Sequence, residues 1–376
     1  MTIKELVEFQ PEVWDKLKTI IHSKRVGSAY CFSGPPGCGK EGMSLAFSAL
    51  LNCENPNKFH SCNCSSCIRF NSLQHEHLHL VVPLPAFKSE SKGELNKKDV
   101  VYFHNELEKK RMNPFHKIRI PRATRIVLPS IKNLRKSLVL TLTQPGRKTA
   151  VIFDAELLGT GSGESANALL KLLEEPPPLT TIILVTDYKN KLFPTIISRC
   201  QYIQFSPLSD ENIERMLSQN GVSKDRLKWI STLSKGNYFS ACKIAERKPE
   251  EIKKLFDFIS DFMLFNDYQK SIEFASTYTK LSKSDPNEFK FHFYLLQRWL
   301  LGTMRLKNGI RDTLNEGKLN TGMTEFLDAF PHTDIRGLNI LTESVVEGLN
   351  NNANMNLLLT HFIIQLQKEL KPKSRS

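Results

Sequence analysis

The chain has 376 residues, of which 40% are hydrophobic and 24% charged, and its formal net charge is +13. This length accommodates two or three domains, each able to bury its own core. No apolar run approaches the roughly 20 residues needed to span a bilayer, and the first residues contain no secretory signal. The composition therefore excludes a membrane-spanning or secreted protein and predicts a cytoplasmic one with no membrane partner.

Positive charge is concentrated in one segment. Between Lys88 and Arg125, 11 Lys or Arg residues stand against 5 Asp or Glu residues, which places a net +6 there. An excess on this scale fits a nucleic-acid partner, whose phosphates it would neutralise. It fits a solvated insertion without a partner equally well, and both interpretations stay open.

Apolar runs alternate with helical patterns through the first half of the chain. The runs AYCFS (29–33), AVIFD (150–154) and TIILVT (181–186) predict buried strands. Residues 11–24 and the stretch ESANALLKLLEEPPP (164–178) space their apolar residues as helices do, and the prolines end the second helix. This alternation predicts an α/β domain with a parallel sheet covered by helices on both faces.

The strand patterns stop after residue 205, and only helical patterns follow. We expect an α/β domain over 1–207, a small helical domain over 208–248 and a larger all-α domain over 249–376. Within the first domain, a cysteine-rich module occupies about 53–67 and a basic insertion about 84–120.

The run FHFYLLQRW (291–299) is rich in aromatic residues. Exposed aromatic side chains stack on nucleic-acid bases, whereas a helix with apolar residues on most faces is usually packed inside a protein or against another subunit. The second interpretation is favoured here.

The stretch SGPPGCGKEG (33–42) follows the first predicted strand and precedes a helical pattern, which is the context of a phosphate-binding loop. The candidate phosphate-binding residues are Gly34, Gly37, Gly39 and Lys40. Glu41 stands where such loops place the hydroxyl that holds Mg²⁺. Two like charges 4 Å apart repel by roughly 4 kcal/mol at an effective dielectric near 20, or about a thousandfold in affinity. We therefore expect impaired ATP binding, with Lys40 paired to Glu41 or to another acid.

A second hydrolytic position is altered in the run VIFDAELL. Hydrolytic sites of this class end the strand with Asp-Glu, whose second residue activates the attacking water. Here Asp154 is in place, but Ala155 occupies the position of the base. If the chain remains extended, the side chain of Glu156 points to the opposite face of the sheet. The alternative is a divergent active site that uses Glu156 as its base.

Four of the eight cysteines lie close together in CENPNKFHSCNCSSC. In a reducing compartment such a cluster favours metal binding, and four thiolates would form a closed, structural zinc site. The C-x-C spacing crowds two ligands, so that His60, His75 or His77 is an alternative ligand; a set of reduced, metal-free cysteines is the other alternative. The predicted zinc ligands are Cys53, Cys62, Cys64 and Cys67.

Together with the cysteine cluster, the stretches VGSAYCFSGPPGCGK, ANALLKLLEEPPP and TIILVTDYKNKLFPTIISRCQYIQFSPL resemble bacterial clamp-loader subunits of the AAA+ class, namely the delta-prime and gamma/tau subunits of DNA polymerase III. The resemblance covers about the first 245 residues, apart from the insertion. It implies an AAA+ phosphate-loop domain, a helical lid and an all-α collar through which subunits assemble. The family's cysteine spacing is C-x8-C-x2-C-x2-C, from which the C-x-C here departs.

The resemblance also assigns roles to individual residues. Arg199 in the run PTIISRCQ matches an arginine finger that reaches ATP on a neighbouring subunit; its alternative is a structural ion pair at a helix end. Thr186 matches a sensor position, Gln10 borders the nucleotide pocket, and Phe239 stands where the family's second sensor is an arginine. The candidate residues of this degenerate nucleotide site thus include Asp154 and Thr186.

Three functional hypotheses follow. The first is a delta-prime-like subunit without ATPase activity of its own, assembled with gamma/tau and delta subunits, that helps load the sliding clamp on primed DNA. The second is an ATP-hydrolysing motor subunit of the gamma/tau kind. The third is a zinc-containing DNA-binding adaptor outside the clamp loader.

Overall fold

A computed structural model describes residues 2–85, 97–140, 145–161, 163–264, 268–310, 318–350 and 353–370. The chain divides into two compact units: unit 1 comprises Met1–Asn212 and Gly236–Phe239, and unit 2 comprises Ile213–Lys235 and Ser240–Ser376. The predicted domain boundaries at residues 207 and 248 stay predictions.

Unit 1 is built on a five-stranded sheet in the order β2-β3-β4-β1-β5, and every pair of neighbouring strands is parallel. The strands are β1 (Ala29–Ser33), β2 (Leu78–Val81), β3 (Lys148–Ile152), β4 (Thr180–Thr186) and β5 (Gln201–Gln204). Since β1 lies between β4 and β5, the loop that follows it opens beside the end of β4. The predicted parallel α/β fold, followed by a helical region, is confirmed.

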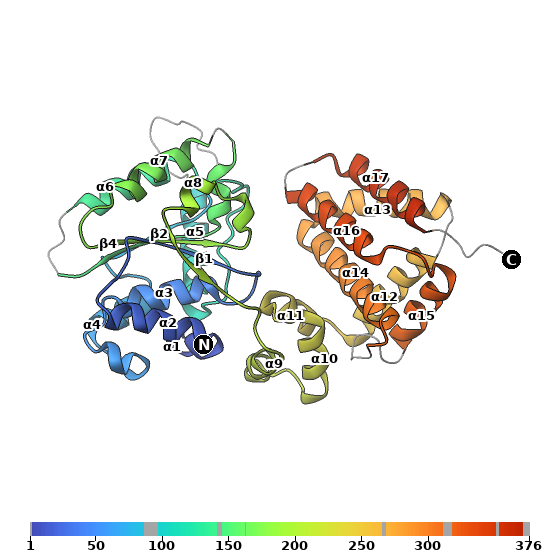
Figure 1. The fold of residues 1–376 in the computed structure, drawn as a ribbon, viewed down its shortest axis with the longest axis horizontal. Helices are drawn as coiled ribbons and strands as arrows, with labels where there is room; N and C mark the ends of the chain where they lie inside the picture. Colours follow the sequence, from blue (N-terminus) through green and yellow to red (C-terminus); the bar gives the residue numbers. More distant parts are fainter. Residues whose placement is uncertain are drawn as a thin grey trace. The chain divides into compact units, whose positions relative to one another are not determined.

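Helices cover both faces of this sheet, as Figure 1 shows. Those of unit 1 are α1 (Ile3–Leu6), α2 (Pro11–His22), α3 (Lys40–Leu50), α4 (Ser65–Asn71), α5 (Lys97–Met112), α6 (Leu128–Val139), α7 (Glu164–Glu174) and α8 (Pro194–Ile197). Successive side chains of a strand point to opposite faces. In β1, Ala29 and Cys31 join the core formed with α6 and α7, whereas Tyr30 and Phe32 contact Phe47 of α3.

Unit 2 is helical throughout the part that the structure describes. It contains α10 (Lys224–Ser234), most of α9 (Asp210–Gln219) and α11 (Tyr238–Ala245), and the longer helices α12 (Pro249–Leu264), α13 (Tyr268–Ser284), α14 (Pro286–Lys307), α15 (Lys318–Ala329), α16 (Ile335–Asn350) and α17 (Met355–Glu369). Helix α14 packs against α12, α13, α15 and α16 and so forms the centre of the unit.

The aromatic run 291–299 lies in α14, where Phe291, Phe293 and Trp299 are at most 3% exposed. The Trp299 ring stands edge-on to Phe326 of α15, and its Nε1 donates to Ser260 Oγ of α12 (3.0 Å). The run is therefore packed inside the unit, as its apolar pattern predicted, and does not offer these rings for base stacking.

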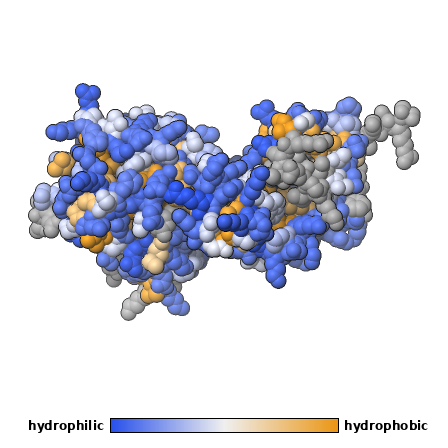
Figure 2. Space-filling model, turned by 90° about the horizontal axis from the view of Figure 1, so that it is seen from below, coloured by the Kyte–Doolittle hydropathy of each residue, from blue (hydrophilic) through white to orange (hydrophobic). Residues whose placement is uncertain are grey.

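None of the helices in the described ranges is long and apolar enough to cross a membrane. On the face drawn in Figure 2, hydrophilic residues cover most of the surface and apolar residues gather only in small groups.

Candidate functional site

The phosphate loop lies between β1 and α3, as its sequence predicted. Gly37 (φ 73°) and Gly39 (φ 91°) adopt left-handed backbone conformations that favour glycine. A side chain at Gly37 would also collide with the chain after α10, since a Cβ there would lie 2.2 Å from Asn237 Oδ1 and 2.7 Å from Tyr238 N. The loop is thus held closely by residues 237 and 238.

The side chain of Lys40 contacts other groups of its own chain. Its Nζ donates to the carbonyl oxygens of Gly34 (2.9 Å) and Pro35 (2.7 Å) and forms an ion pair with Asp187 Oδ1 (2.7 Å). The side chain is 4% exposed. The sequence analysis expected Lys40 to pair with Glu41 or with another acid. The structure shows the second arrangement, with Asp187 as the acid.

Asp187 was not identified from the sequence, although its position carried a signal. It directly follows Thr186, the last residue of β4, and β4 is the neighbour of β1 in the sheet. Functional side chains of parallel sheets gather at the carboxyl ends of adjacent strands. The residue after a predicted central strand was therefore a candidate.

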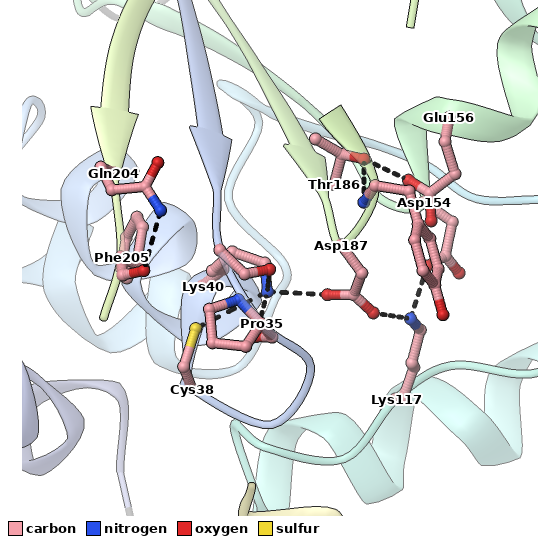
Figure 3. A network of polar contacts seen from close by, with 12 residues as sticks. Pro35, Cys38, Lys40, Lys117, Asp154, Glu156, Thr186, Asp187, Gln204 and Phe205 are labelled. Carbon is pink, nitrogen blue, oxygen red and sulfur yellow. Dashed lines mark hydrogen bonds and ion pairs between the residues drawn. The ribbon is translucent and has the colours of Figure 1, made fainter. Parts of the chain in front are cut away.

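Two lysines of the basic insertion, Lys110 and Lys117, reach the same group of acids; Figure 3 shows Lys117 between Asp154 and Asp187. Lys117 Nζ lies 2.6 Å from Asp154 Oδ1 and 3.1 Å from Asp187 Oδ2. Lys110, which is 1% exposed, forms an ion pair with Glu41 and lies 5.1 Å from the centre of the Phe153 ring. Glu41, Asp154 and Asp187 thus each face at least one lysine.

Burial and the neighbouring charges shift the pKa values of three of these groups, Asp187, Lys117 and Lys110. Burial favours the neutral forms, but Lys117 and Lys40 outweigh it and lower the pKa of Asp187. For Lys117, burial opposes the charge, and Asp154, Asp187 and Glu41 hold its pKa well above the usual value. Burial lowers the pKa of Lys110 despite the opposing effect of Glu41.

Little space remains above the loop. The cavity there has a volume of about 20 Å³ and is lined by residues of the loop, of the strand ends and of the insertion: Gly37, Gly39, Lys40, Glu41, Gly42, Pro114, Phe115, Lys117, Asp154, Val185, Thr186, Asp187 and Phe239. A cavity needs about 10–15 Å³ for one water molecule. The enclosed space directly above the loop is therefore of the size of one water molecule.

The end of β3 differs from the sequence-based expectation for Glu156. Asp154 has a left-handed backbone (φ 50°), and Ala155–Gly159 form a 3-10 helix, so that the chain is no longer extended. Glu156 consequently lies on the site's side, where Thr186 Oγ1 donates to its Oε2 (2.6 Å). The opposite-face orientation was expected only for an extended chain, and that condition is not met. Burial, followed by the nearby charge of Asp154, raises the pKa of Glu156 to about 7.

The other candidate residues of this site also lie at its border. Gln10 Nε2 donates to Cys38 O (3.1 Å) and Ser206 O (2.8 Å), which ties the N-terminal segment to the loop and to the chain after β5. Phe239 lines the cavity without contributing any charge. Gly34 approaches the chain after β5 closely, since a Cβ there would lie 2.6 Å from Phe205 O.

Arg199 lies after α8 at a different place in unit 1. Its Nη1 donates to Thr195 O (2.9 Å), and its Nη2 forms an ion pair with Glu174 Oε1 of α7 (2.7 Å). The arginine side chain is 37% exposed and that of Glu174 49%. Arg199 is not among the residues that line the cavity.

The four clustered cysteines converge despite the C-x-C spacing. The Sγ atoms of Cys53, Cys62, Cys64 and Cys67 all lie within 4.8 Å of one another. Tetrahedral zinc with Zn–S bonds near 2.3 Å requires sulfur atoms about 3.8 Å apart, so the set fits a four-thiolate site. Cys67 N–H donates to Cys64 Sγ (3.5 Å), which orients that sulfur. The backbone N–H of Cys64 lowers the pKa of Cys62 to about 7, whereas burial raises that of Cys53 to about 11.

The alternative histidine ligands do not belong to this group of atoms in the described chain. Both ring nitrogens of His75 are engaged, Nε2 with Ser66 Oγ (3.0 Å) and Nδ1 with the backbone N–H of His77 (3.1 Å). His60 is exposed and stands edge-on to Trp14 (6.2 Å between ring centres).

Comparison with known proteins identifies the family. The sequence profile described as "DNA polymerase III, delta subunit" matches residues 9–209, more than half of the chain. The chain belongs to this family. The matched region of this delta-family chain contains the phosphate loop, the cysteine cluster and Arg199, which agrees with the resemblance found in the sequence.

Individual relatives are similar over about half of the chain. DNA polymerase III subunit delta′ of Bacillus subtilis is 28% identical over 231 residues, which are 61% of this chain and 58% of that protein. Subunit tau of the same organism is 27% identical over 205 residues, 54% of this chain and 29% of tau. Subunit delta′ of Pseudomonas aeruginosa is 28% identical over 173 residues, 46% of this chain and 41% of that protein. The alignments thus span less than two thirds of each of these relatives.

The raised pKa of Glu156 predicts that the stability of the folded chain depends on pH. The folded chain retains this proton up to about pH 7, whereas the unfolded chain loses it near its usual pKa of 4.5. Stability contributed by the protonated group is therefore lost as the pH rises from about 4.5 to 7. Glu156→Gln keeps the acceptor for Thr186 and should be more stable than the wild type at pH 8, by about 3 kcal/mol at most. Near pH 4.5 the two should be equal.

Urea unfolding of both proteins across this pH range measures the difference. Glu174→Gln, which alters an exposed carboxylate, is the matched control and should show no such trend. A Glu156→Gln variant whose stability relative to the wild type does not change with pH would contradict the placement of this carboxyl group.

The cysteine cluster makes a second prediction. The full chain should carry an equimolar amount of zinc, measurable by mass spectrometry of the metal content. Cys62→Ser should lose this zinc and melt at a lower temperature, because a closed structural site contributes directly to folding. Cys242→Ser, outside the cluster, should retain it. Equal zinc content in the two variants would remove Cys62 from the site.

Proposed function

We propose that this chain is a delta′-type subunit of the DNA polymerase III clamp loader that does not hydrolyse ATP itself and supplies Arg199 to ATP held by a neighbouring subunit. One contrast carries the proposal: the chain's own phosphate-loop site is closed by internal ion pairs, while Arg199 remains exposed outside it. Family membership supports the clamp-loader assignment.

Loss of hydrolysis is supported at three points. Glu41 replaces the hydroxyl ligand of Mg²⁺ and is engaged by Lys110. Ala155 cannot activate water, and Asp154 is paired with Lys117. Lys40, which would contact the outer phosphates of a nucleotide, is paired with Asp187 instead. The candidate nucleotide ligands are therefore in use within the chain.

The contacts of Arg199 support a role in trans. Exposed ion pairs such as Arg199–Glu174 contribute about 0–1 kcal/mol, so exchanging Glu174 for a phosphate costs little. A guanidinium placed beside a γ-phosphate stabilises the charge that develops during phosphoryl transfer. The hydrogen bond from Nη1 to Thr195 O orients the guanidinium group.

The remaining features fit the same assignment. The four cysteines would hold a structural zinc ion that braces the segment between α3 and α4. Unit 2 would serve as the lid and collar through which the chain joins gamma/tau and delta subunits. The complete assembly would act on the sliding clamp and primed DNA.

A motor subunit is the second candidate, because Glu156 lies on the site's side of the sheet. Its carboxyl group is 7% exposed and accepts a hydrogen bond from Thr186. A base that activates water needs access to that water, so the burial of Glu156 favours the non-hydrolysing assignment.

Reconstitution with the ATPase and delta subunits of the same clamp loader tests the proposal. Arg199→Ala should assemble normally in size-exclusion chromatography, while turnover at the adjoining ATP site falls by on the order of 10³-fold. Lys171→Ala, which removes an exposed positive charge from α7, is the control and should leave turnover unchanged. Normal turnover with an assembled Arg199→Ala complex would refute the arginine finger.

A further inference from the structure

The insertion helix α5 turns charged side chains inward. Asp99, Glu106 and Lys110 are at most 8% exposed, whereas Val101 is 61% and Met112 70% exposed. Helices on a protein surface normally bury their apolar stripe and expose their charges. The reversed pattern indicates that ion pairs, more than apolar burial, hold α5 against the rest of unit 1.

Glu106 fixes the turn that follows α5. It accepts hydrogen bonds from Lys109 Nζ (2.8 Å) and from the backbone N–H of Arg119 (3.2 Å), and it contacts His116 Nε2 (2.9 Å). Lys110 adds a hydrogen bond to His116 O (2.7 Å). The residues between Lys110 and Arg119 are thereby held in one conformation over the phosphate loop.

Apolar residues of this turn lie directly on the loop. The Phe115 ring is 3.3 Å from where a Cβ of Gly39 would be, and it packs against Tyr238 (4.7 Å between ring centres). Pro114 lies as close to Gly42, with its Cβ 3.1 Å from a Cβ built there. Phe115 is 3% exposed, which shows how completely the turn and the loop cover each other.

The charges around the cavity balance without a nucleotide or a metal ion. Three ammonium groups face three carboxylates: Lys40, Lys110 and Lys117 against Glu41, Asp154 and Asp187. In a working site of this class, Mg²⁺ and the nucleotide's phosphates would compensate the loop lysine and the strand-end carboxylates.

We propose that residues 97–117 are an internal plug of the phosphate-loop site, in which the Lys117 ammonium group takes the place of a metal cation between Asp154 and Asp187 and Phe115 covers the loop. The plug excludes Mg²⁺·ATP from the folded chain. This deepens the proposed loss of hydrolysis and is independent of the arginine finger, since it concerns the isolated chain alone.

Replacing Lys117 tests the plug. Lys117→Met leaves Asp154 without its lysine and Asp187 with Lys40 alone, and millimolar Mg²⁺ should then bind between the two carboxylates. At tenfold saturation the melting temperature of the variant should rise by about 3–6 °C in Mg²⁺ relative to EDTA. The wild type should show no such shift, and a fluorescent ATP analogue with Mg²⁺ should show no saturable binding to it.

The control is Arg111→Met, which removes one positive charge from the exposed side of α5, where Arg111 pairs with Glu108. It should behave as the wild type does. A second variant, Lys117→Met with Asp154→Asn, removes both members of the 2.6 Å pair and should fold without showing the Mg²⁺ shift.

Each outcome of these experiments either supports the plug or overturns it. A Mg²⁺ shift confined to Lys117→Met, or folding of that variant only in Mg²⁺, supports the plug. Saturable nucleotide binding to the wild type overturns it, as does a folded Lys117→Met without a shift, or failure of both Lys117 variants to fold. Because no partner subunit is present, these results do not depend on whether Arg199 acts in trans.

Discussion

The ion pairs of Lys117 with Asp154 and Asp187 are the contacts on which the arrangement of the site depends. Both carboxylates come from the ends of adjacent parallel strands, so the sheet itself brings two negative charges together. Buried charges of one sign require compensation, and removing one partner of a buried pair typically costs about 3–5 kcal/mol. In ATPases of this fold Mg²⁺ provides the compensating positive charge. In this chain a lysine from the insertion provides it.

Compensation of negative charge by a lysine also accounts for the glutamate at position 41 of the phosphate loop. With Lys110 available, a carboxylate at position 41 is paired and hydrogen-bonded in the folded chain. Glu41 is therefore part of an internal ion-pair network and not an isolated defect of a nucleotide site. The basic insertion and the degenerate loop, two separate peculiarities of the sequence, have one structural explanation.

Much of unit 1 was predictable because its signals are local. The apolar runs at β1 and β4 and the glycine loop predicted the central strands of the sheet, with the bounds of β4 wrong by one residue. The edge strands β2 and β5 were not predicted, because each has only four residues and β5 has exposed glutamines at both ends. The convergence of Cys62 and Cys64 with the other cysteines followed from clustering in the sequence.

The plug could not be predicted, since it depends on contacts between residues far apart in the chain. Lys110 and Glu41 are 69 positions apart, and nothing in the weak periodicity of 97–117 indicates which lysines are buried. The orientation of Glu156 was missed for a local reason, the left-handed turn at Asp154. An aspartate in that conformation is uncommon and is not evident from the strand pattern before it.

A chain of this kind would keep an AAA+ shape for docking while its own catalytic groups neutralise one another. The most direct test is the release of inorganic phosphate by the purified full-length chain alone, at saturating Mg²⁺·ATP. The account predicts no release above the rate of the buffer blank. Steady, protein-dependent release that disappears in a Lys40→Ala variant would contradict it.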